Sequence, residues 1–109
     1  MRGVGIDIVE IDRVRKANTD ALAGKILSAP EHERYEGFSA ERKISFLAGR
    51  FAAKEAIIKC LSAYELPEFA DLIITNDEKG RPQIRYKDYE ILLSISHEKN
   101  YATAIAILE

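Results

Sequence analysis

The first residues of the chain alternate between two kinds of side chain with a period of two. Within residues 3–9, one face carries the larger apolar residues Val4, Ile6 and Ile8. The other face carries Gly3, Gly5, Asp7 and Val9. This alternation predicts a β-strand with one buried face. Because glycines are the same-face neighbours of Asp7, we expect open space beside its carboxylate.

The longest helical pattern spans residues 40–62, which contain no proline and only one glycine, Gly49. Apolar residues recur there at helical spacing on two sides, so this helix is expected at the centre of the fold. The preceding residues 10–38 predict short helices joined by turns. Asp12 is expected to cap one of these helices, and Pro30 marks the start of another.

The C-terminal half reads as strands. Strands are predicted at 69–76, 81–87, 91–97 and 101–108, with a turn at 76–80 and a hairpin at 98–100. A strand, then helices, then several antiparallel strands predicts an α+β fold in which a long central helix and short helices pack on one side of an antiparallel sheet. We expect residues 1–109 to form a single domain.

Composition narrows the classes of function. With 16 basic and 18 acidic residues the net charge is −2, which argues against nucleic acid as the main partner. No apolar run approaches the ~20 residues needed to span a membrane. The only cysteine, Cys60, has an apolar helical context and is expected in the core. A lone cysteine and an N-terminus without signal-peptide layout predict a cytoplasmic protein.

Charged residues on the long helix are the first candidates for chemistry. Glu55 and Lys59 are spaced i,i+4 and lie on one side, beside alanines that leave room for a ligand. Arg50 and Lys54 form a basic stripe on another side. The helix alone allows two interpretations: a surface ion pair, or charged groups that serve a site in a largely buried helix.

Two further candidates lie on predicted strands. Asp7 is either a residue of a solvated face or a ligand for a hard cation such as Mg²⁺, which takes one or two carboxylates together with phosphates and waters. Ser96 and His97 end another strand, where His97 either binds a ligand or is satisfied by a turn. The chain has no phosphate-binding glycine loop, no dinucleotide motif and no His/Cys cluster at zinc spacing.

Three blocks of sequence together resemble the holo-acyl-carrier-protein synthases, the small bacterial class of 4'-phosphopantetheinyl transferases. These blocks are GVGIDIVEIDRV at 3–14, FLAGRFAAKEA at 46–56 with a further lysine at position 59, and LSISHEKNYA at 93–102. They occur in the family's order and near its usual spacing. The resemblance implies transfer of 4'-phosphopantetheine from coenzyme A to a serine of an acyl carrier protein, in support of fatty acid biosynthesis, with adenosine 3',5'-bisphosphate as the other product.

The resemblance also implies roles for individual residues. Asp7 and Glu55 match the family's magnesium ligands, and Lys59 matches a lysine that contacts phosphate; these three are the expected catalytic residues. The expected coenzyme A contacts are Arg42, Arg50, Lys54, Lys59, Ser96 and His97. The proton of the attacking serine passes to Glu55 or to water on the metal, and the residues leave this choice open. The family works as a homotrimer with its sites between subunits.

A basic patch is expected to dock the acidic carrier protein, although a solvated helix face explains the same residues. Its members are Arg13, Arg15, Lys16 and Lys25. The chain departs from the family at 61–64, where Leu-Ser-Ala-Tyr replaces a glycine-containing turn. Two alternatives therefore stand beside the transferase: a family member with altered or lost activity, and a non-catalytic module that binds nucleotides or proteins.

Overall fold

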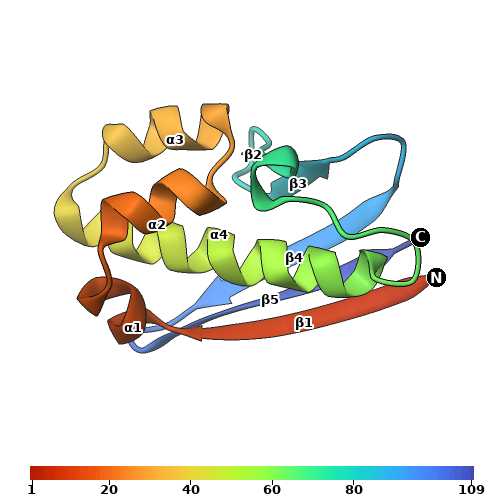
Figure 1. The fold of residues 1–109 in the computed structure, drawn as a ribbon, viewed down its shortest axis with the longest axis horizontal. Helices are drawn as coiled ribbons and strands as arrows, with labels where there is room; N and C mark the ends of the chain where they lie inside the picture. The colour runs from red at the N-terminus through yellow and green to blue at the C-terminus, as the bar shows by residue number, and fades with distance from the viewer.

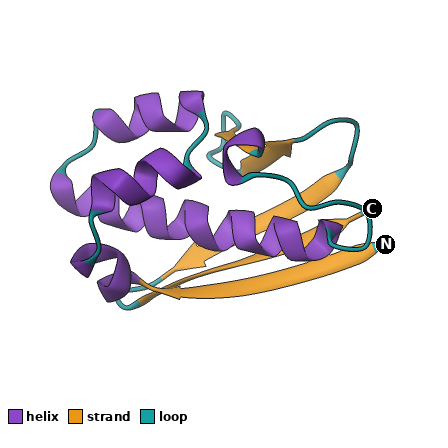
Figure 2. Cartoon of the chain, viewed as in Figure 1, coloured by secondary structure: helices purple, strands orange, loops and turns teal.

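The computed structural model describes residues 1–109 as one long helix lying across a twisted antiparallel sheet, with shorter helices beyond it (Figures 1 and 2). The elements in chain order are β1 (Gly3–Glu10), α1 (Ile11–Lys16), α2 (Thr19–Ile26), α3 (Ala29–Glu36), α4 (Ala40–Leu61), a 3₁₀ turn (Phe69–Asp71), β2 (Ile73–Asn76), β3 (Pro82–Arg85), β4 (Ile91–His97) and β5 (Tyr101–Leu108). The predicted α+β class is confirmed. No helix is both long and apolar enough to cross a membrane.

The strands form two antiparallel sheets instead of one. The larger has the order β1-β5-β4, and the smaller pairs β2 with β3. In the larger sheet Asp7 pairs with Ala104, which in turn pairs with Ile95. The strand predicted at 69–76 begins instead with the 3₁₀ turn, and only its second half pairs, with β3.

Of the two signals expected to start short helices, one is confirmed and one is wrong. Pro30 lies in the first turn of α3, as predicted, and Glu31 accepts a hydrogen bond from the backbone N–H of Ser28 at 2.7 Å. Asp12 is not a cap: Glu10 holds that position, and Asp12 lies in the first turn of α1. A carboxylate there still opposes the positive end of the helix.

Helix α4 packs directly on β1 and β5, and glycines make this close approach possible. A Cβ at Gly5 would lie 2.0 Å from the carbonyl oxygen of Ala56, and one at Gly3 would lie 2.2 Å from that of Cys60. Alanines 48, 52, 53 and 56 of α4 are completely buried. The expected open space beside Asp7 is therefore wrong on its glycine side, because the backbone of α4 fills it.

This contact decides which face of β1 is buried. Val4, Ile6 and Ile8 point away from the helices and are 55%, 63% and 65% exposed. Leu92 and Ile105, on the neighbouring strands, are exposed on the same side. The outer face of the sheet is thus apolar and uncovered within one chain.

Candidate active site

Asp7 and Glu55 come together because α4 lies on β1. Asp7 lies midway along the strand, Glu55 lies in the second half of the helix, and both line one cavity of about 370 Å³ together with Arg13 and Phe51. Burial raises the pKa of Glu55, and the nearby charge of Asp7 raises it further, while Lys59 partly opposes the shift. The two carboxylates are therefore close enough to repel each other.

Lys59 completes this group from the next turn of α4. Its Nζ donates to Asp7 Oδ1 at 3.1 Å and to the carbonyl oxygen of Ile6 at 2.9 Å. The side chain is half exposed, so the ammonium remains accessible from solvent. The structure thus brings together all three residues predicted to be catalytic.

The donor set of this group suits a hard divalent cation. Asp7 and Glu55 supply carboxylate oxygens, and a cation between them would relieve the repulsion that, after burial, raises the pKa of Glu55. No third His, Cys, Asp or Glu joins them. That count fits Mg²⁺, which usually keeps several waters and takes phosphate oxygens of the substrate.

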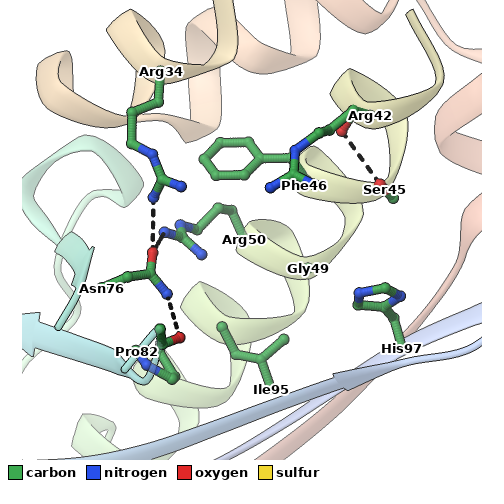
Figure 3. Close-up of a pocket in the computed structure, with 11 residues that line it drawn as sticks. Arg34, Arg42, Ser45, Phe46, Gly49, Arg50, Asn76, Pro82, Ile95 and His97 are labelled. Carbon is green, nitrogen blue, oxygen red and sulfur yellow. Dashed lines mark hydrogen bonds between the residues drawn. The ribbon is translucent and has the colours of Figure 1, made fainter. Parts of the chain in front are cut away.

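A second cavity, of about 280 Å³, lies on another side of α4 between that helix, α3 and the sheets (Figure 3). Its lining residues are Arg34, Arg42, Ser45, Phe46, Gly49, Arg50, Asn76, Gly80, Pro82, Ile95 and His97. Three guanidinium groups and an imidazole with no carboxylate in the lining favour an anionic ligand. Arg42, Arg50 and His97, all predicted to contact coenzyme A, meet here.

Ser96 does not join them. Side chains alternate along β4, so Ser96 lies on the outer face of the sheet while His97 and Ile95 line the cavity. Ser96 pairs with Thr103 of β5 and is exposed.

The structure corrects the expectation that Lys54 binds coenzyme A. Its side chain is completely buried, and its Nζ donates to Glu31 Oε1 at 2.5 Å, to the carbonyl oxygen of Ile26 at 2.7 Å and to that of Phe69 at 2.9 Å. An ammonium group has three protons, and all three are used. Burial lowers the pKa of Lys54, and Glu31 partly offsets this. Lys54 therefore holds α2, α3 and α4 together.

Comparison with known proteins shows the family of the chain. A family model of the 4'-phosphopantetheinyl transferase superfamily matches residues 3–106. The chain belongs to this superfamily. It is 44% identical over 112 residues to the holo-acyl-carrier-protein synthase of Staphylococcus carnosus, covering 98% of this chain and 96% of the relative.

Solved structures of the superfamily share the fold over the whole chain. The Bacillus anthracis holo-acyl-carrier-protein synthase, in complex with CoA (3',5'-ADP), superposes with a TM-score of 0.89 at 36% identity and covers 98% of this chain and 95% of its own. The Neisseria meningitidis synthase gives 0.87 at 28% identity, with coverage of 100% and 98%.

The residues expected to dock a carrier protein lie on α1 and α2 of this transferase fold. Arg13 lines the cavity of Asp7 and Glu55, and Lys25 is exposed in the last turn of α2. The other two are partly neutralised within the chain. Arg15 lies 3.0 Å from Glu41, and Lys16 lies 2.8 Å from Asp12.

The turn at 61–64, where the resemblance leads us to expect glycine, is held by other contacts. After α4 the chain reverses at 62–64, and the backbone N–H groups of Tyr64 and Glu65 donate to the carbonyl oxygen of Leu61. The Glu65 carboxylate accepts hydrogen bonds from Tyr86 Oη at 2.6 Å, Tyr89 Oη at 2.7 Å and Lys87 Nζ at 2.7 Å. These bonds, that of Lys87 first, lower the pKa of Glu65 to about 2. A fixed carboxylate clamp thus anchors the connection that lacks glycine.

Three residues of the transferase structure escaped prediction from sequence. Arg34 and Asn76 line the anion cavity, and Glu31 binds Lys54 and Arg50 behind it. Glu31 gave a sequence signal as the N3 residue of a capping box that begins at Ser28. That signal predicts the start of a helix, and it does not predict a contact with α4. Arg34 and Asn76 are 42 residues apart, and no local spacing relates them.

Proposed function

We propose that this chain is a holo-acyl-carrier-protein synthase, which transfers 4'-phosphopantetheine from coenzyme A to a serine of an acyl carrier protein. The observation that carries the proposal is the meeting of Asp7 and Glu55 at one cavity, with Lys59 hydrogen-bonded to Asp7, in a chain that matches synthases over its full length. Phosphoryl transfer needs charge neutralisation and alignment, and this group supplies both kinds of charge.

The proposed reaction has one bond formed and one broken. The serine oxygen of the carrier attacks the β-phosphate of coenzyme A, and the bond from that phosphorus to the bridging pyrophosphate oxygen breaks, releasing adenosine 3',5'-bisphosphate. Lys59 stabilises negative charge on the phosphates from its half-exposed position. The carboxylate of Glu55 lines the same cavity and can accept the serine proton.

We propose that the enzyme depends on magnesium, held by Asp7 and Glu55. When bound, the ion polarises the pyrophosphate and neutralises charge on it. The strand and the helix that carry the two carboxylates are packed backbone to backbone, so this rigid contact fixes the position of one carboxylate relative to the other.

The second cavity supports a binding role for Arg42, Arg50 and His97. Coenzyme A has a pyrophosphate, which we place at Asp7, Glu55 and Lys59, and a separate phosphate on the 3' position of its ribose. The arginine cavity is a separate anion site on the same chain, and we propose that it takes that 3'-phosphate.

We propose that the protein is a homotrimer with its sites between subunits. The two cavities lie on different sides of α4, so the binding site for one coenzyme A molecule would combine a cavity from each of two neighbouring chains. The uncovered apolar face of the sheet, around Ile6, Ile8 and Ile105, offers a surface for that assembly. The number of subunits, three, comes from the resemblance, and light scattering of the purified protein would measure it.

Mass spectrometry of an apo carrier protein incubated with coenzyme A and magnesium tests the transfer. We expect the carrier to gain the mass of phosphopantetheine with the wild-type enzyme and with Glu33→Gln, a control on the exposed face of α3, but not with Glu55→Gln. The absence of any gain across the carriers tested would exclude the synthase activity.

Calorimetry of coenzyme A binding, with and without magnesium, separates the remaining alternatives. A member with lost activity binds coenzyme A through Asp7 and Glu55 but transfers nothing. A non-catalytic module binds equally well without magnesium and after Asp7→Ala. The proposed enzyme requires magnesium for full affinity and loses that dependence in Asp7→Ala.

A further inference from the structure

The anion cavity contains more positive charge than its neighbours compensate. Of Arg34, Arg42 and Arg50, only Arg50 faces a carboxylate, with its Nε 3.3 Å from Glu31 Oε2. Arg50 is almost completely buried, whereas Arg34 and Arg42 are exposed. Burying a guanidinium beside others is unfavourable unless counter-charge is supplied, and the one carboxylate here, Glu31, is shared with Lys54.

Arg34 is held beside Arg50 by a single amide. Arg34 Nη1 donates to Asn76 Oδ1 at 2.7 Å, and Arg50 Nη2 donates to the same oxygen at 3.0 Å (Figure 3). The Nδ2 of Asn76 donates to the carbonyl oxygen of Gly80 at 2.9 Å, which fixes the orientation of the amide. The amide oxygen is neutral, so it brings the two cations together without cancelling either charge.

Aromatic rings support the same arrangement. The guanidinium of Arg34 lies beside two rings that contact each other, 5.5 Å from the centroid of Phe46 and 5.8 Å from that of Phe38. Arg50 lies 4.6 Å from Phe46, and Arg42 lies 4.6 Å from Phe38. The contacting pair of rings thus has all three guanidinium groups around it, which helps to order them at the cavity before a ligand arrives.

We propose that Arg34 is a specificity-determining residue of this site, which makes the protein select ligands that carry a phosphomonoester on the ribose. This inference rests on the proposed function and adds a residue to it from α3. A phosphomonoester carries about −1.5 to −2 charges near neutral pH and three acceptor oxygens, which match two adjacent guanidinium groups. Each guanidinium has five donors, so both retain free N–H groups after binding Asn76.

The test compares coenzyme A with 3'-dephospho-coenzyme A, which lacks only this phosphate, by calorimetry in the presence of magnesium. Arg34→Gln should weaken coenzyme A binding by roughly three- to tenfold, as for loss of one partly exposed charged hydrogen bond, and leave the dephospho ligand unchanged. Arg34→Lys, which keeps the charge but not the fork of donors, should recover part of the loss. Arg85→Gln, an exposed arginine of β3, is the matched control and should bind both ligands like the wild type.

Equal weakening of both ligands in Arg34→Gln would overturn the proposal, because it would show that Arg34 acts through Asn76 on the fold. Unchanged binding of coenzyme A would overturn it as well. The transfer assay separates this result from the proposed function. If the wild-type protein transfers no phosphopantetheine, the synthase activity is rejected. If the wild type nevertheless prefers coenzyme A to the dephospho ligand and Arg34→Gln does not, the role of Arg34 is supported.

Discussion

Replacing Gly5 with alanine places one methyl group between β1 and α4, at the contact that joins the two proposed metal ligands. The added Cβ would lie 2.0 Å from the carbonyl oxygen of Ala56 and 2.8 Å from Cβ of Lys59, whereas ordinary contacts begin at 3.4 Å. The nearer obstacle is backbone and cannot rotate away. Strand and helix therefore have to separate locally by more than an ångström.

Overpacking of this kind typically costs about 1–3 kcal/mol, and we expect the upper end, about 3 kcal/mol, because the clash involves a helix carbonyl. In a domain of this size that loss lowers the thermal midpoint by more than about 10 °C. The same displacement moves Asp7 away from Glu55 and Lys59. A misplacement near 1 Å costs on the order of 100-fold in rate, so Gly5→Ala should lose most of its transfer activity even where it is folded.

Urea unfolding measures the stability, and the rate of carrier modification by mass spectrometry measures the activity. Gly24→Ala is the matched control, because a Cβ at this exposed position of α2 meets no atom within 4 Å. It should leave activity unchanged and stabilise the helix by up to about 1 kcal/mol. If Gly5→Ala unfolded at the same urea concentration and kept the wild-type rate, the inference that this glycine sets the distance between the metal ligands would be refuted.

Two further predictions concern charged groups. Because burial, and then Asp7, raises the pKa of Glu55, the native state holds this proton more tightly than the unfolded chain, and stability falls as pH rises through the raised pKa. In calorimetric scans Glu55→Gln should therefore melt at a higher temperature than the wild type near about pH 8 but not near about pH 4. Magnesium should raise the melting temperature of the wild type only. Equal melting temperatures at the higher pH would contradict the first expectation, and equal responses to magnesium would contradict the second. Lys54→Met leaves the buried Glu31 carboxylate without the nearer of its two cationic partners and should cost about 3–5 kcal/mol in urea unfolding, with partial recovery in the double variant with Glu31→Gln. A loss below about 1 kcal/mol would show that the pair is not what fixes these helices.

The elements themselves were largely predictable. The strands expected at 91–97 and 101–108 match β4 and β5, and the long helix expected at 40–62 matches α4 to within one residue. Local periodicity and the position of proline determine such elements, because each residue interacts first with its neighbours along the chain. The least regular region, 69–87, was predicted least well, since a 3₁₀ turn and two short strands leave little periodic signal.

The direction of the buried face in β1 was not available from its pattern. Val4, Ile6 and Ile8 form the more apolar side, yet the side with Gly3 and Gly5 is buried against α4. The apolar pattern of a strand does not show that a helix backbone will pack closely against its glycine-bearing face. The outer face carries apolar residues as well, which fits the proposed assembly of several chains.

The sequence by itself determined the helices and strands and, through its three blocks, the resemblance that selected Asp7, Glu55 and Lys59. The tertiary structure decided what the basic stripe of α4 does. Arg50 and Lys54 are i,i+4 neighbours on the same side of the helix. Lys54 forms a buried ion pair with Glu31 of α3. Arg50, in contrast, donates to Asn76 of β2, which also accepts from Arg34 at the same cavity. Helical spacing gives the side of a helix on which a residue lies, and only the packing of distant segments determines whether that side meets a carboxylate or an open anion site.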